Sequence, residues 1–75
     1  MTQIAPRIVV DPQVRFGRPV IEGTRVPVEL LVGKLAGGMS IDDLVDEYQV
    51  TREDVLAALA YAARAVAEEQ VRAVP

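Results

Sequence analysis

Residues 40–59, SIDDLVDEYQVTREDVLAAL, carry the strongest architectural signal in the chain. Ser40 and Thr51 are hydroxyl residues of the kind that cap helix N-termini, and apolar residues follow each of them at helical spacing. The spacing predicts a short helix over 41–48 and a longer one from residue 52 onward. Two capped helices joined by a tight turn are typical of the helix-turn-helix motif, in which the helices cross at a steep angle.

The later of these helices is expected to run over 52–70 and to be apolar on every face. Residues 55–63 form an unbroken apolar run, and a helix of this kind is normally covered on more than one side. The alternative is that alanine is simply a good helix former whose exposure costs little. We favour a subunit or partner interface, with candidate residues Leu56, Leu59, Tyr61, Ala63 and Val66.

A further helix is predicted over 28–36, before the helix-turn-helix pattern. Its apolar residues recur at positions i, i+3, i+4 and i+7 from Val28. Pro27 suits the first helical position, where a missing N–H costs nothing. Gly37 and Gly38 then end the helix as a C-terminal cap.

The N-terminal part reads as short β segments. Residues 1–7 lack periodicity and are expected to fray. Residues 8–10 are β-branched and precede a turn-forming Asp-Pro pair, which predicts a strand. Residues 19–21 and 24–26 flank Glu22 and Gly23, which predicts a tight hairpin with Gly23 at positive φ.

We therefore expect a mainly α protein: a three-helix, homeodomain-like bundle preceded by a short β-hairpin. A single domain would cover 8–75, with the hairpin arm at 8–27 and the helical body at 28–70. A chain of 75 residues without cysteine or histidine has no disulfide to stabilise it, and so we expect a homodimer. Absence of cysteine fits a reducing cytoplasm, and no apolar run approaches the roughly 20 residues that cross a bilayer.

Charge is unevenly distributed along the chain. Residues 1–28 carry four arginines against two carboxylates, a balance of +2, and residues 29–75 carry four cations against nine carboxylates, a balance of −5. Any polyanion or acidic partner would meet the N-terminal third first. The binding candidates are Arg7, Arg15, Arg18 and Arg25, with ordinary solvated side chains as the alternative.

Reading of DNA by the third helix is disfavoured. Arg52 is the one strong hydrogen-bond donor at the positions that would face base edges, which also include Glu53 and Leu56. The acidic residues of the second helix would repel phosphates. We keep Arg52 as a candidate contact but expect the helix-turn-helix shape to serve another purpose.

No catalytic apparatus is visible, and we expect a protein that is not an enzyme. The chain lacks both histidine and cysteine, the usual proton-transfer and nucleophilic groups. Asp42, Asp43, Asp46 and Glu47 could in principle bind a cation, but they are the polar complement of an apolar stripe. The glycines lack the lysine and hydroxyl of a phosphate-binding loop. We expect no cofactor, no metal and no small-molecule substrate.

The chain resembles the small prokaryotic family known as domain of unknown function 433. The resemblance covers about residues 8–67 and rests on Val10-Asp11-Pro12, the Gly-Arg-Pro-Val-Ile-x-Gly-Thr-Arg-Val-Pro-Val run of 17–28, and the Ala-Gly-Gly of 36–38. Its characteristic residues are Gly17, Pro19, Gly23, Thr24, Pro27, Gly37 and Gly38. The region of Tyr48, Thr51 and the alanine-rich third helix extends it.

The resemblance implies a homeodomain-like fold and an antitoxin role in a type II toxin–antitoxin pair. The implied partner is a PIN-like ribonuclease with a carboxylate active site, and the pair would in addition repress its own operon through operator DNA. The alternative function is a small DNA-binding transcriptional regulator. Either the arginine arm or the third helix would contact the ribonuclease, and the sequence leaves this choice open.

Overall fold

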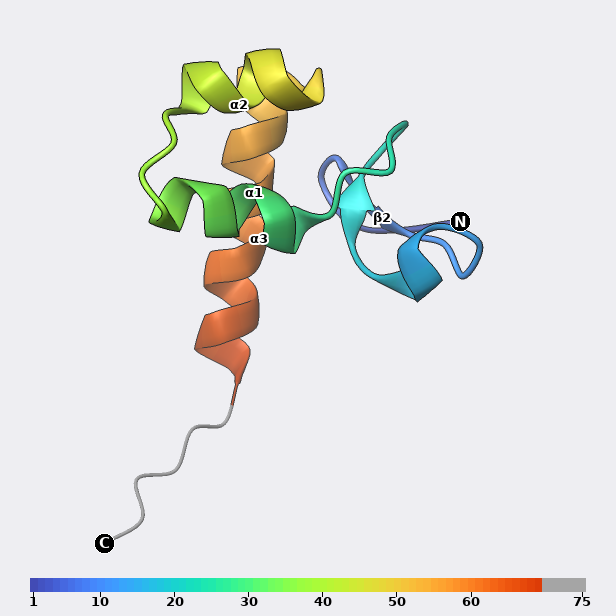
Figure 1. The fold of residues 1–75 in the computed structure, drawn as a ribbon. Coiled ribbons are helices and arrows are strands. Elements are labelled where there is room, and N and C mark those ends of the chain that lie inside the picture. Colours follow the sequence, from blue (N-terminus) through green and yellow to red (C-terminus); the bar gives the residue numbers. More distant parts are fainter. Residues whose placement is uncertain (70–75) are drawn as a thin grey trace, which may run out of the picture.

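The computed structural model describes residues 1–69, which form a small sheet beside a body of three helices (Figure 1). The strands are β1 (Thr2–Ala5), β2 (Ile8–Val10) and β3 (Val20–Ile21), and the helices are α1 (Val28–Ala36), α2 (Ile41–Tyr48) and α3 (Arg52–Glu68). The sheet is antiparallel with the order β1-β2-β3. The predicted class, three helices preceded by short β segments, is confirmed.

The helix boundaries agree closely with the capping signals. The Ser40 hydroxyl accepts a hydrogen bond from the Asp43 backbone N–H at 3.0 Å, which starts α2. Thr51 and Asp54 form a reciprocal capping box at the start of α3. Between these helices Gln49 takes the left-handed conformation, with φ 57°, and its Nε2 donates to the Asp46 carbonyl at 2.9 Å. This bond helps hold a non-glycine residue in a turn that glycine usually occupies.

The bounds predicted for the first helix, 28–36, are those of α1. Pro27 is the cap residue before the helix and not its first helical residue, with extended backbone at φ −69° and ψ 143°. The cause is strand pairing, since Pro27 forms a β-bridge with Val20 and the neighbouring Val28 N–H donates to the Pro19 carbonyl at 3.0 Å.

The expectation that residues 1–7 fray was wrong. β1 pairs with β2 through Thr2–Val10, Gln3–Val9 and Ala5–Ile8, with an irregularity around Ile4. Ala5 is buried, with 9 % of its surface exposed. Pairing with a neighbouring strand satisfies the backbone groups of this segment, and local periodicity does not reveal such a partner.

The hairpin predicted over 19–26 is present in part, as a turn closed by an isolated β-bridge between Val20 and Pro27. Gly23 has φ +80° as expected, and the Ile21 N–H donates to the Val26 carbonyl at 3.0 Å. Residues 24–26 form no strand, however, and the strand partner of β3 is β2, through Ile8–Ile21 and Val9–Val20. Both residues of β3 are buried.

The core lies where the sheet meets the helices. Its fully buried side chains come from every layer: Ile8, Val20, Ile21, Leu31, Leu44 and Val55. α3 is the central element, because it packs on α1, α2 and β2. Its C-terminal half extends beyond α1 (Figure 1), which leaves part of a largely apolar helix outside the body.

An ion pair fastens the β1–β2 turn to the helical body. The Arg7 guanidinium lies 3.0 Å from the Asp54 carboxylate, whose side chain is 13 % exposed. Partial burial by itself raises the pKa of Asp54, but hydrogen bonds from the Thr51 backbone and from Arg7 outweigh burial and hold this pKa below its ordinary value of 3.8. The folded state therefore favours the ionised carboxylate.

Asp54→Ala is expected to lower the free energy of unfolding by about 1 kcal/mol, because it removes a cap and an ion-pair partner. A depressed pKa contributes stability that is complete above the ordinary value of Asp54 and is lost as the pH falls through the folded value. Urea titrations measure the free energy of unfolding. Between neutral pH and a pH below about 3, this free energy should fall more for the wild type than for the variant. Asp43→Ala, at the equivalent exposed position of α2, is the control; equal losses from both changes would contradict this account.

Candidate functional site

The four arginines of the arm do not form one cluster. Arg7 is paired with Asp54, and Arg18 is paired with Glu29 of α1 at 2.6 Å. The Arg15 Nε donates to the backbone carbonyl of Arg25 at 3.2 Å. Arg7 and Arg18 therefore brace the arm against the helices, while Arg15 and Arg25 lie together on the loops.

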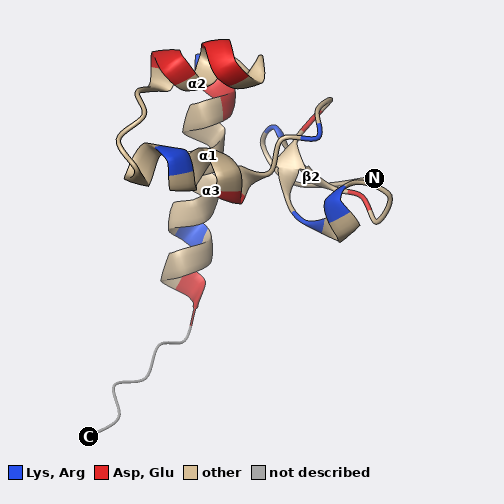
Figure 2. Ribbon diagram, viewed as in Figure 1, with Lys and Arg blue, Asp and Glu red and all other residues tan. Residues whose placement is uncertain are grey.

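Charged residues are unevenly distributed over the fold (Figure 2). Basic positions occur in the loops around the sheet and on α1 and α3, acidic positions also occur in those loops, and four acidic residues lie on α2. Arg52 is exposed at the start of α3. It lies two residues before Asp54, whose carboxylate is paired with Arg7, so the structure brings Arg7 to the same end of α3 as Arg52.

The five interface candidates on α3 fall into two groups. Leu59 and Tyr61 are half-buried and pack against the core, so their first role is structural. Leu56 and Val66 are 45 % and 66 % exposed, and Ala63 is exposed as well. At 100° per residue, Leu56 and Ala63 lie about 20° apart around the helix, and Val66 lies about 60° from Ala63.

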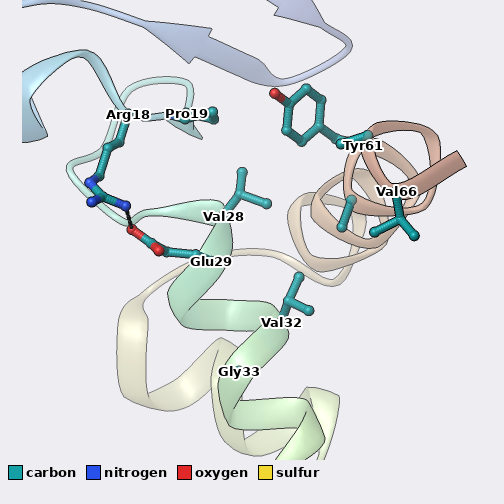
Figure 3. Close-up of a pocket in the computed structure, with 10 residues that line it drawn as sticks. Arg18, Pro19, Val28, Glu29, Val32, Gly33, Tyr61 and Val66 are labelled. Carbon is teal, nitrogen blue, oxygen red and sulfur yellow. Dashed lines mark hydrogen bonds and ion pairs between the residues drawn. The ribbon is translucent and has the colours of Figure 1, made fainter. Parts of the chain in front are cut away.

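An apolar groove runs between α1 and the C-terminal half of α3 (Figure 3). It has a volume of about 440 Å³, and Val28 and Val32 of α1 face Tyr61 and Val66 of α3 across it. The exposed Arg18–Glu29 pair lies at its rim. A groove of apolar walls with a charged edge is suited to an apolar side chain or a helix face of another chain.

The sequence predicted one wall of this groove but missed the other. The sequence predicts Val66 and Tyr61 as interface residues, because α3 is apolar on more faces than its own chain is expected to cover. Val28 and Val32 were instead assigned to the buried stripe of α1, and the structure places Val28 in the core and leaves Val32 partly exposed. The missed signal is that α3 is far longer than the helix that covers it.

A second hollow lies on the loops of the arm. Pro12, Gln13, Arg15, Phe16 and Arg25 enclose a volume of about 540 Å³. Phe16 is 97 % exposed, more than any other large apolar residue of residues 1–69. Sequence reasoning did not single out Phe16, because one aromatic residue between an arginine and a glycine gives no periodic signal.

Within residues 1–69, no helix is long and apolar enough to cross a membrane. In the same part of the chain, no group of three or more acidic side chains lies close enough to hold a metal ion. The acidic residues of α2 are exposed, as expected for a solvated face.

The fold defines a small, mainly α domain with a helix-turn-helix arrangement and an N-terminal sheet. The chain belongs to the family described as "Protein of unknown function (DUF433)", whose model matches residues 8–62. The match includes β2, β3, α1, α2 and most of α3. No curated protein matches this sequence.

Two solved structures are similar to this chain. A DUF433 member protein from Anabaena variabilis has 32 % sequence identity and a TM-score of 0.75, covering 83 % of this chain and 62 % of its own. Rv2018 from Mycobacterium tuberculosis has 35 % identity and a TM-score of 0.64, covering 69 % of this chain and 24 % of its own. The chain thus spans less than two thirds of either relative.

Proposed function

We propose that this chain is an antitoxin-like interaction protein, which acts as a homodimer and binds and neutralises a PIN-like ribonuclease. The observation that carries the proposal is the apolar groove between α1 and α3. It lies beside a projecting helix end whose Val66 is 66 % exposed, and contiguous apolar surface of this kind marks interaction sites. The family resemblance supplies the ribonuclease as the partner.

The projecting half of α3 suits a second copy of the chain. Val66 lies here among small exposed residues, Ala63, Ala65 and Ala67, which would let a partner helix approach closely. If two α3 helices cross in antiparallel fashion at Val66, the two Val66 side chains meet on the two-fold axis and cover each other. A two-fold interface must be complementary to itself, and an exposed apolar residue on the axis meets that condition.

The arm suits an acidic partner. A PIN-like active site gathers carboxylates around a metal, and guanidinium groups form strong, geometrically defined pairs with carboxylates. Arg15 and Arg25 lie outside the two ion pairs that brace the body. They are therefore the arginines that the proposal assigns to the ribonuclease, and a homodimer would present two such pairs.

The charge distribution weighs against the alternative of a DNA-binding regulator. The helix-turn-helix shape is present, but α2 carries four carboxylates and the first turn of α3 carries Glu53 and Asp54. Phosphates would be repelled at the face that this motif normally presents to DNA. Repression of the operon therefore becomes a property of the antitoxin–ribonuclease complex in this proposal.

Co-expression with the open reading frame beside the gene tests the proposal. The neighbour alone is expected to arrest growth, and the chain is expected to restore growth and to co-purify with the neighbour as a stable complex. A catalytically inactive neighbour, with one active-site carboxylate replaced by the corresponding amide, should still form the complex. A non-toxic neighbour that forms no complex would rule out the antitoxin role, and duplex DNA binding by the chain alone would favour the regulator.

A further inference from the structure

The turn Arg15–Gly17, called here the Phe16 turn, places an aromatic side chain in solvent on a constrained backbone. Phe16 is 97 % exposed. Arg15, Phe16 and Gly17 have φ values of 50°, 57° and 80°, so three consecutive residues lie in the left-handed region. Side-chain-bearing residues rarely adopt this region, and bulky ones least of all.

Neighbouring hydrogen bonds hold the Phe16 turn in place. The Gly17 N–H donates to the Val14 carbonyl and the Arg18 N–H donates to the Arg15 carbonyl, both at 3.1 Å. The Arg15 side chain donates to the Arg25 carbonyl, which ties the turn to the segment before α1. Strain that the surroundings enforce in this way is concentrated at binding and catalytic sites.

The turn also exposes an aromatic ring to water at a position where other residue types would suit the backbone better. A glycine or asparagine would adopt the same backbone at lower cost, and neither would expose an aromatic ring to water. The backbone strain and the exposed ring both destabilise the free chain. When an aromatic side chain held rigidly on a loop enters a pocket of a partner, its ring is buried and little conformational entropy is lost.

Cationic groups surround the aromatic ring. Arg15 and Arg25 line the same hollow as Phe16, and no carboxylate lines it. Aromatic residues and arginine are the residue types enriched at the energetic centres of protein interfaces. The arrangement fits an apolar pocket whose rim carries carboxylates.

We infer that the Phe16 turn is the anchor of the ribonuclease interface, with Phe16 in an apolar pocket of the ribonuclease and Arg15 and Arg25 paired with carboxylates at the rim of that pocket. This inference rests on the proposed function and names the surface that performs it. A single-stranded nucleic acid would also stack a base on an exposed aromatic ring. The net charge of −3 and the acidic helical body oppose an extended polyanion, which favours the protein partner.

Phe16→Gly gives opposite expected effects on folding and binding. Removing the side chain relieves the left-handed strain, so the urea midpoint should stay unchanged or rise. Affinity for the purified, inactive ribonuclease, measured by calorimetry, should fall at least about tenfold. Phe16→Trp keeps an aromatic anchor and should retain binding. Ile4→Ala, which trims an exposed apolar residue of β1, is the matched control and should bind as the wild type does.

The possible results separate the inference from the proposed function. Wild-type binding that Phe16→Gly leaves unchanged would overturn the inference and leave the antitoxin role standing. No binding by the wild type would overturn both. Binding of a fluorescein-labelled single-stranded oligonucleotide is the third measurement. If Phe16→Gly loses affinity for the oligonucleotide while its affinity for the ribonuclease is unchanged, the turn binds nucleic acid and the inference fails.

Discussion

Leu31→Ala is expected to lower the free energy of unfolding by about 3 kcal/mol. Leu31 is fully buried at the centre of α1, within the core formed by the sheet and all three helices. The change removes apolar contacts and leaves a cavity that neighbouring helices close only in part. The free energy of unfolding of a whole domain of this size is about 4–11 kcal/mol, so the variant should be markedly less stable.

Leu56→Ala is the matched control, because it makes the same chemical change at a site that is 45 % exposed on α3. It should cost no more than about 1 kcal/mol, since less apolar surface returns to water. Urea unfolding followed by circular dichroism measures both variants. Equal losses would mean that α1 is not packed over the core as described.

Val66→Asp is expected to disrupt the homodimer with little effect on the fold of each copy. Val66 is 66 % exposed in the single chain but lies at the centre of the proposed α3–α3 crossing. A carboxylate buried there without a partner raises the dimer dissociation constant at least about a hundredfold, equivalent to about 2.7 kcal/mol. Sedimentation equilibrium should show dimers for the wild type and monomers for the variant at the same concentration.

Ala67→Asp provides the comparison for this effect. It places the same charge on the next residue of α3, which is also exposed and lies on a different face of the helix. Both changes put a negative charge near the helix C-terminus, which the helix dipole disfavours equally. Loss of the dimer in both variants would show that charge near the helix end, and not contact at Val66, is responsible.

The helices could be predicted because their signals are local. Ser40 and Thr51 cap helices through hydrogen bonds to residues three positions away, and apolar spacing then fixes which face is buried. The strands depend on partners elsewhere in the chain. β1 is a strand because β2 lies beside it, and the sequence of residues 2–5 carries no period that would reveal this.

The candidate site was predictable in composition but not in arrangement. The sequence identified the arginines of the arm, yet the pairing of Arg7 with Asp54 joins residues 47 positions apart and follows only from the fold. Phe16 could not be identified from the sequence, because its left-handed backbone and its exposure are properties of the folded chain. The groove could not be predicted either, because it forms where α3 extends past α1, and the relative placement of two helices depends on packing.

Inhibition of the purified ribonuclease by the purified chain is the most direct test of the central claim. The neighbouring gene product, which the proposal expects to be the ribonuclease, would be titrated with increasing amounts of the chain while cleavage of a labelled RNA is followed. We expect activity to fall to background at a stoichiometric ratio of the two proteins, with Phe16→Gly needing a clear excess. Full ribonuclease activity at a large excess of the folded wild-type chain would contradict the account.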